Sequence, residues 1–227
     1  MNREVQGVIM VLFGSATLRI SIGDTFLNYV KEFMQPWLIA SGAILVILGL
    51  FTLADAVRRR PHGHGPASAW FLLAPVLAIF LIAPPALGAY TAARDITNAI
   101  PTSTEVLPLP PGDPVEIYVS DYINRAVWDD GRTLEGRTVE ITGFVTPTPD
   151  GGWWLTRLSL ACCAADAFAG KIQIVDPPVA WIAPAANTWV IATGRWIPGG
   201  GTRSDVAVPL LQAEAIVEIP QPRNPSD

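Results

Sequence analysis

The residues best suited to chemistry are two adjacent cysteines. Cys162 and Cys163 are the only cysteines of the chain, and Asp166 follows three positions after the second. The Cα atoms of neighbouring residues lie about 3.8 Å apart, whereas disulfide-bonded cysteines usually have Cα atoms roughly 4.4–6.8 Å apart. A disulfide between these two residues would therefore be strained and easily reduced, which leaves both thiols as candidates for other chemistry.

Two kinds of chemistry suit such a pair. Thiolates bind soft metal ions such as zinc or copper(I), and Asp166 offers a third metal ligand. Alternatively, Cys162 and Cys163 exchange disulfides with other proteins. A closed zinc site needs four ligands and no histidine follows His64, so a fourth ligand would come from a carboxylate, water, substrate or partner. The plainer interpretation makes one cysteine a small buried hydrophobic residue and Asp166 a turn cap.

Other catalytic signatures are missing from the sequence. There is no glycine-rich phosphate loop, no zinc-protease motif and no Ser-His-Asp set, and the two histidines, His62 and His64, stand beside three arginines in a polar stretch. Two imidazoles alone hold a metal weakly, and a solvated loop is the simpler interpretation. The sequence therefore disfavours an enzyme and leaves thiol redox activity as the one enzymatic alternative.

Two adjacent tryptophans are candidates for contact with a partner protein. Trp153 and Trp154 lie in a segment with strand character, so their side chains must point to opposite faces. At least one of them is then partly exposed or covered by another element, and that one is the candidate contact.

The composition predicts a membrane module joined to an acidic domain. Hydrophobic residues make up 50% of the chain and charged residues only 15%, against about 25% charged residues in soluble domains. Residues 1–90 carry six basic and four acidic side chains, and the remainder carries nine basic and sixteen acidic ones. An acidic domain argues against a nucleic-acid partner, because binding to nucleic acid depends on Lys and Arg side chains that neutralise the phosphates.

Three apolar segments predict transmembrane helices, at about 5–22, 36–55 and 67–88. The first is interrupted by Arg19, which would reach toward the lipid headgroups, and a cleaved signal peptide is its alternative. The arginines at 58–60 place their loop in the cytoplasm, next to anionic lipid headgroups. The N-terminus is then cytoplasmic and everything after Tyr90 is extracytoplasmic, in the plasma membrane of a bacterium.

The remainder predicts a proline-rich linker over 91–114 and a mainly-β domain over 115–227. A short strand at 115–119 and a short helix at 121–128 precede five strands separated by turns. Glycines in mid-strand, Gly143 and Gly194, are typical of a small barrel that bends sharply. The expected fold is therefore membrane α-helices plus an OB-like five-stranded barrel, with an immunoglobulin-like sandwich as the alternative.

The sequence resembles the YcgQ-like family of bacterial membrane proteins. The resemblance covers most of the chain and is carried by the N-terminal apolar helices, APPALGA, RTVEITGFV, LACCAADA, NTWVIATGRW and AEAIVEIPQPRNP, of which LACCAADA is the most specific. It implies an accessory subunit that works with a multi-helix, YcgR-like permease, and so gives a class of partner rather than a substrate.

Three functional hypotheses follow. The first is a non-enzymatic permease subunit whose outer barrel binds a solute, a metal ion such as zinc or copper, or the permease itself. The second is an envelope thiol-redox protein that uses Cys162 and Cys163. The third is a structural envelope protein, in which Trp153 and Trp154 would matter more than the cysteines.

Overall fold

The computed structural model describes residues 3–58, 88–94, 98, 106–182 and 184–227. The chain divides into two compact units, Met1–Ala86 and Leu87–Asp227. The third apolar segment predicted at 67–88 lies outside the described residues apart from its last position, as do His62 and His64.

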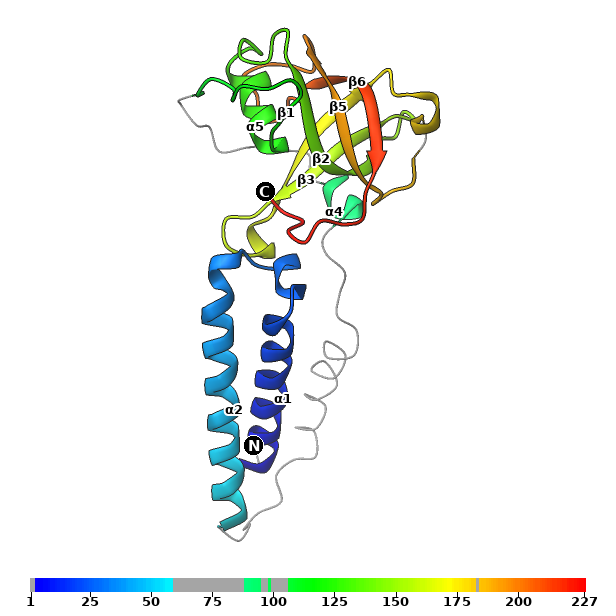
Figure 1. The fold of residues 1–227 in the computed structure, drawn as a ribbon. Coiled ribbons are helices and arrows are strands. Elements are labelled where there is room, and N and C mark those ends of the chain that lie inside the picture. The colour runs from blue at the N-terminus through cyan, green and yellow to red at the C-terminus, as the bar shows by residue number, and fades with distance from the viewer. Residues whose placement is uncertain (1–2, 59–87, 95–97, 99–105, 183) are drawn as a thin grey trace. The chain divides into compact units, whose positions relative to one another are not determined.

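The first unit contains two antiparallel apolar helices, α1 (Arg3–Ile22) and α2 (Gln35–Arg58), joined by the 3-10 turns η1 (Thr25–Asn28) and η2 (Glu32–Met34) (Figure 1). Their bounds agree with the first two predicted segments, and Arg19 lies in the last turn of α1. Both helices are long and apolar enough to cross a membrane, although near an N-terminus a signal sequence shares these features.

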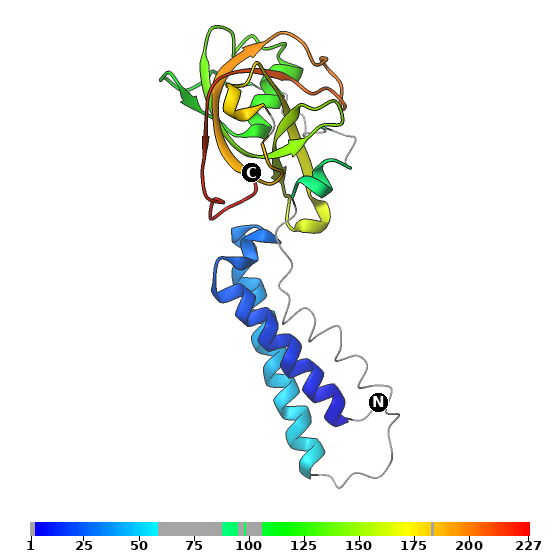
Figure 2. The same ribbon diagram turned by 90° about the vertical axis from the view of Figure 1, so that its right-hand side faces the viewer.

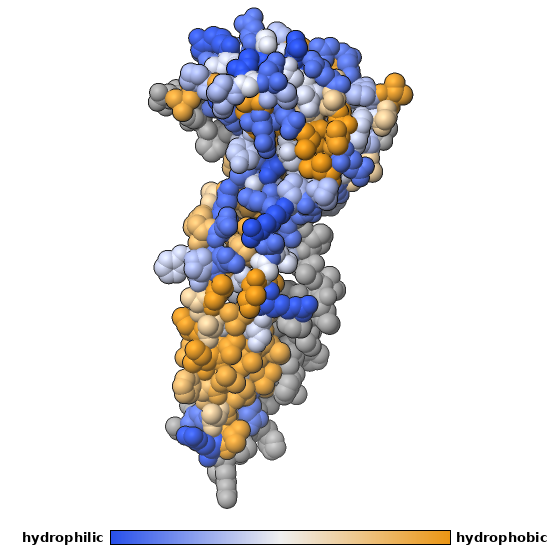
Figure 3. Space-filling view, in the orientation of Figure 1, coloured by the Kyte–Doolittle hydropathy of each residue, from blue (hydrophilic) through white to orange (hydrophobic). Residues whose placement is uncertain are grey.

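Much of α1 and α2 is apolar and unburied, and Figure 3 shows an orange band of such side chains on one face of this unit. Only 28% of the apolar window in the first helix and 11% of that in the second are buried. Large side chains such as Trp37, Ile44 and Phe51 are more than half exposed. The core helices of a soluble domain bury such side chains, so these two helices have the surface of lipid-facing segments.

Small residues at seven-residue spacing let α1 and α2 pack closely. A Cβ atom added at Gly14 would lie 2.7 Å from the carbonyl oxygen of Gly42, and one added at Gly7 would lie 3.0 Å from that of Gly49. Gln35 Nε2 donates to the carbonyl oxygen of Ser21 at 3.0 Å, one heptad further along the same contact. Close backbone approach at small residues is the usual basis of helix association in membranes.

The second unit is a closed barrel of the five strands β2–β6 (Figures 1 and 2). The strands are β2 (Thr138–Pro147), β3 (Trp153–Ser159), β4 (Phe168–Val175), β5 (Trp189–Ile197) and β6 (Leu210–Glu218). Neighbours follow the order β2-β3-β4-β6-β5, and β5 pairs with β2 to close the barrel. Only the β4–β6 pair among these strands is parallel. The predicted OB-like barrel is thus confirmed.

The two mid-strand glycines occupy sites of close backbone approach. A Cβ atom at Gly143 would lie 2.7 Å from the carbonyl oxygen of Thr156, and one at Gly194 would collide with the backbone of Gln212. The pairing of β5 with β6 shifts register between Thr193 and Gly194. These glycines permit the bends that close a small barrel.

The elements before the barrel complete its core. Strand β1 (Val115–Glu116) pairs in parallel with β2, and helix α5 (Val119–Ile123) continues directly into the π-helical turn η4 (Asn124–Trp128). The helical segment begins two residues before the predicted range of 121–128. Its apolar residues Val119, Tyr122 and Ile123 are at most 1% exposed and belong to the same core as the barrel strands.

The described parts of the proline-rich segment also contact the barrel. The short helix α4 (Ala89–Ala92) packs Ala89 and Ala92 in a cluster with Phe144, Leu158 and Ala169. Further on, Arg125 Nη1 donates to the carbonyl oxygen of Leu107 at 2.7 Å. Both ends of the segment are therefore held by the domain that follows it.

Candidate thiol–carboxylate site

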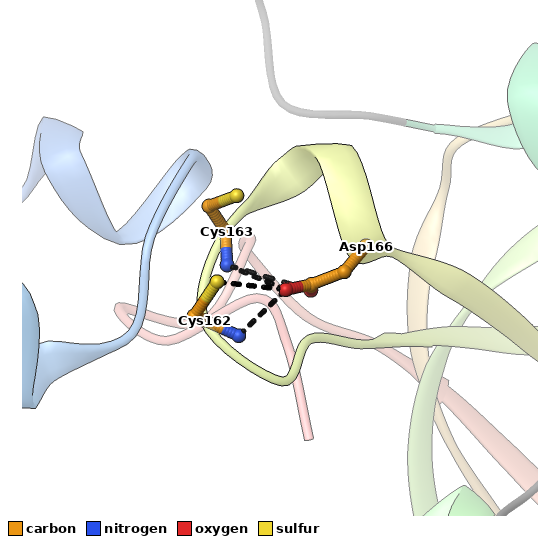
Figure 4. A group of neighbouring side chains, drawn as sticks. All are labelled: Cys162, Cys163 and Asp166. Atoms are coloured by element: carbon orange, nitrogen blue, oxygen red, sulfur yellow. Dashed lines mark hydrogen bonds between the residues drawn. The ribbon is translucent and has the colours of Figure 1, made fainter.

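The loop between β3 and β4 brings the two cysteines and Asp166 together. Asp166 ends the 3-10 turn η5 (Ala164–Asp166), and its backbone N–H donates to the carbonyl oxygen of Cys163 at 3.0 Å. The turn points the carboxylate back at the start of the loop, as Figure 4 shows. One thiol or carboxylate atom from each of the three residues lies within 4.8 Å of the others.

The carboxylate of Asp166 holds the loop in shape. Its Oδ1 accepts from the backbone N–H of Ala161 at 2.9 Å, and its Oδ2 accepts from that of Cys162 at 2.9 Å. The N–H of Cys163 adds longer contacts of 3.4 and 3.3 Å to the two oxygens. An aspartate that accepts from successive backbone N–H groups is a common way to stabilise a turn, so Asp166 has a structural role here.

The thiol of Cys162 also donates to this carboxylate, at a Sγ–Oδ2 distance of 2.9 Å. This hydrogen bond, followed by the influence of the neighbouring Cys163 thiol, raises the pKa of Cys162 to about 12. The same thiol, followed by the backbone N–H groups, lowers the pKa of Asp166 to about 2. At neutral pH the pair is thus a protonated thiol beside an ionised carboxylate, because the hydrogen bond stabilises that arrangement.

The site is open to solvent. Cys162 is exposed and Cys163 and Asp166 are partly exposed, so neither thiol is the buried hydrophobic residue of the plainer interpretation. In Figure 4 the Cys162 sulfur faces Asp166, whereas the Cys163 side chain points away from it. Within the part of the chain that the structure describes, no other cysteine, histidine or carboxylate side chain joins the group as a fourth metal ligand.

We expect Asp166→Asn to make Cys162 more reactive. Losing the carboxylate removes the interaction that raises the pKa of Cys162, so the thiolate fraction at pH 8 increases and alkylation accelerates roughly tenfold or more. In a Cys163→Ser parent, where Asp166 still accepts from the Cys162 thiol, the rate should keep rising with pH above the ordinary cysteine pKa of 9.0. Iodoacetamide labelling of Cys162 in a Cys163→Ser background measures both rates, and equal rates at pH 8 would contradict the expectation.

The two candidate contact tryptophans have different surroundings. Trp153 is 2% exposed in the barrel core, and its Nε1 donates to the carbonyl oxygen of Trp181 at 2.9 Å. Trp154 is partly exposed on the outer face, with Lys171 Nζ 5.3 Å from its ring centroid. Of the pair, Trp154 is therefore the one that presents surface to a partner.

The barrel domain also has a cleft of about 700 Å³ that the sequence does not predict. Five separate parts of the chain line it, around Leu107, Tyr118, Thr142, Arg157 and Ile219. Its two arginines, Arg125 and Arg157, already pair with carboxylates. No local sequence pattern indicates such a cleft, because the residues that line it come together only in the folded domain.

These features define an OB-type barrel that carries an exposed thiol–carboxylate loop, in a chain with two apolar N-terminal helices. Residues 120–226, which include the loop and all five barrel strands, match the model of the DUF1980 C-terminal domain, a domain of unknown function. No curated protein and no solved structure matches the chain.

Proposed function

We propose that this protein is a membrane-anchored accessory subunit of a permease, and that its barrel binds a thiophilic metal ion through Cys162, Cys163 and Asp166. The observation that carries the metal site is the convergence of three ligand atoms within 4.8 Å on one exposed loop. Two thiolates and a carboxylate suit zinc or copper(I), since thiolate ligands favour these ions.

The carboxylate beside Cys162 favours metal binding over redox exchange: both need the thiolate, but only a metal cation is also attracted by Asp166. Disulfide exchange requires a thiolate as the attacking group, and the contact with Asp166 keeps Cys162 protonated. A metal cation competes for the same position between sulfur and carboxylate, and replaces the thiol proton when it binds. The role is therefore binding rather than catalysis.

The anchor consists of α1 and α2. Their closely packed glycines and exposed apolar side chains suit a helical hairpin that stays in a bilayer, in preference to a cleaved signal peptide. The arginines that begin at Arg58 support a cytoplasmic location for the end of α2, since cytoplasmic loops carry an excess of Lys and Arg. With a third helix over 67–88, the N-terminus is cytoplasmic and the barrel lies outside the plasma membrane of a bacterium.

The permease partner rests on the resemblance of the chain to the YcgQ-like family. The match of residues 120–226 to a DUF1980 domain is compatible with that resemblance and adds no substrate. Trp154 offers the barrel a surface for contact with such a partner.

Metal content tests the site directly. We expect full-length protein purified in mild detergent to retain about one zinc or copper(I) ion per chain after dialysis, and the Cys162→Ser/Cys163→Ser variant to retain almost none. Asp150→Asn, a change in another exposed loop, is the matched control. Equal metal content in the parent and the double variant would exclude the thiol site.

Purification of the tagged protein from its native membrane tests the partner. Mass spectrometry should find a multi-helix permease in stoichiometric amount. Recovery of the protein alone contradicts the permease role, and recovery with only thiol-bearing envelope proteins favours the redox alternative.

A further inference from the structure

The thiol–carboxylate site has one strong and one weak kind of ligand. Each oxygen of Asp166 already accepts a 2.9 Å hydrogen bond from a backbone N–H, that of Ala161 or that of Cys162. These bonds disperse the carboxylate charge and leave it a poorer donor to a cation than a thiolate. A bound ion would be held mainly by the two sulfurs.

The loop does not depend on the ion for its shape. The backbone N–H groups hold the Asp166 carboxylate, and the turn η5 is closed by the bond from Asp166 N to Cys163 O. If the ion leaves the carboxylate, these bonds remain. Exchange of this ligand therefore costs little conformational rearrangement.

The open side of the site faces solvent at Cys162. The described residues supply three ligands where a closed zinc site has four. An incoming thiolate or imidazole can therefore reach the ion before any protein ligand has left.

We propose that this loop is a transfer site: Cys162 and Cys163 hold the ion, Asp166 is the ligand that leaves first, and a thiolate or imidazole of an acceptor protein takes its place. This inference rests on the proposed metal-binding function and assigns it a direction, from the barrel to a partner with stronger ligands.

The exchange balances without electron transfer. Loading forms two metal–sulfur bonds and one metal–oxygen bond to Asp166 in place of water on the ion, and releases the two thiol protons to water. The metal–oxygen bond to Asp166 then breaks as the bond to the acceptor forms. A second acceptor ligand displaces the cysteine sulfurs, which regain their protons from water, and the ion keeps its oxidation state throughout.

The test uses full-length protein in detergent, loaded with one equivalent of Zn²⁺, and the chromophoric chelator 4-(2-pyridylazo)resorcinol as acceptor. We expect the transfer rate to rise in proportion to chelator concentration, because the acceptor enters before a ligand leaves. A rate independent of chelator concentration overturns the proposal, and this arm needs no variant.

A stronger third ligand should trap the ion. Asp166→Cys is expected to keep zinc bound and to slow transfer at least about tenfold, while Asp150→Cys controls for an added exposed thiol. Zinc-loaded Asp166→Cys that transfers at the parental rate overturns the role of Asp166. Failure of the parent to load any zinc is a separate result, which excludes the metal site itself.

Discussion

Trp153→Ala is expected to lower the free energy of unfolding of the barrel by about 3–5 kcal/mol. The side chain is 2% exposed within the barrel core, so its removal leaves a large cavity. It also removes the donor to the carbonyl oxygen of Trp181, which belongs to the turn η6 (Val179–Trp181). Denaturant unfolding of the full chain in detergent, followed by the β-sheet circular dichroism signal, measures the loss.

The adjacent tryptophan provides a matched control. Trp154 lies on the outer face of the same strand, and the Lys171 ammonium group lies 5.3 Å from its ring centroid. We expect Trp154→Ala to cost about 1 kcal/mol or less. Equal losses from both variants would contradict the assignment of the two faces. Loss of the permease from Trp154→Ala, with stability retained, would support Trp154 as a partner contact.

These two tryptophans show where sequence reasoning ends. The two-residue period of a strand predicts opposite faces for Trp153 and Trp154, and the structure agrees. Which face is inside depends on the register of β3 against β2 and β4, and that register is set by the whole barrel. The alternation of side chains along one strand does not by itself show which of the two faces is buried.

The barrel itself was predictable because its local signals agree with one another. Alternating apolar residues marked the strands, and glycines at positions 143 and 194 marked the bends. The start of the helical segment was placed less accurately, at 121 rather than Val119. Val119 is β-branched and a poor local signal for a helix, but burial against the barrel core outweighs that weak preference.

The site was predicted as a set of residues but not as an arrangement. The spacing of Cys162, Cys163 and Asp166 made a metal site conceivable, and the loop does bring them together. The bonds from the backbone N–H groups of Ala161 and Cys162 to the carboxylate depend on the dihedral angles of the loop, which residue types do not specify. The protonated state of Cys162 follows from that arrangement and could not be anticipated.

The sequence also does not predict a contact between two distant parts of the chain. Arg157 of β3 forms an ion pair with Asp227, with 2.7 Å between Nε and Oδ1, and its Nη2 donates to the carbonyl oxygen of Asn224 at 3.0 Å. The Asp227 backbone N–H donates to the carbonyl oxygen of Leu158. The segment after β6 is thereby attached to β3, although nothing local in either sequence indicates the pairing.

Arg157→Ala should therefore be strongly destabilising. The two side chains are 8% and 4% exposed, so the variant leaves the Asp227 carboxylate buried without its arginine. Removing one partner of a buried ion pair costs about 3–5 kcal/mol, because the remaining charge is poorly solvated. The free energy of unfolding, measured as for Trp153→Ala, should fall by that amount.

An exposed ion pair of the same barrel gives the comparison. Arg195 and Glu214 approach to 2.9 Å with side chains 55% and 48% exposed, and Arg195→Ala should cost only about 0.2–1 kcal/mol. Adding Asp227→Asn to Arg157→Ala should recover part of the loss, because the buried charge is then gone. The opposite result is a double variant that loses as much stability as Arg157→Ala and Asp227→Asn lose separately, added together. That result would show that the buried carboxylate is not the origin of the effect. The lost packing of the arginine side chain would then account for it.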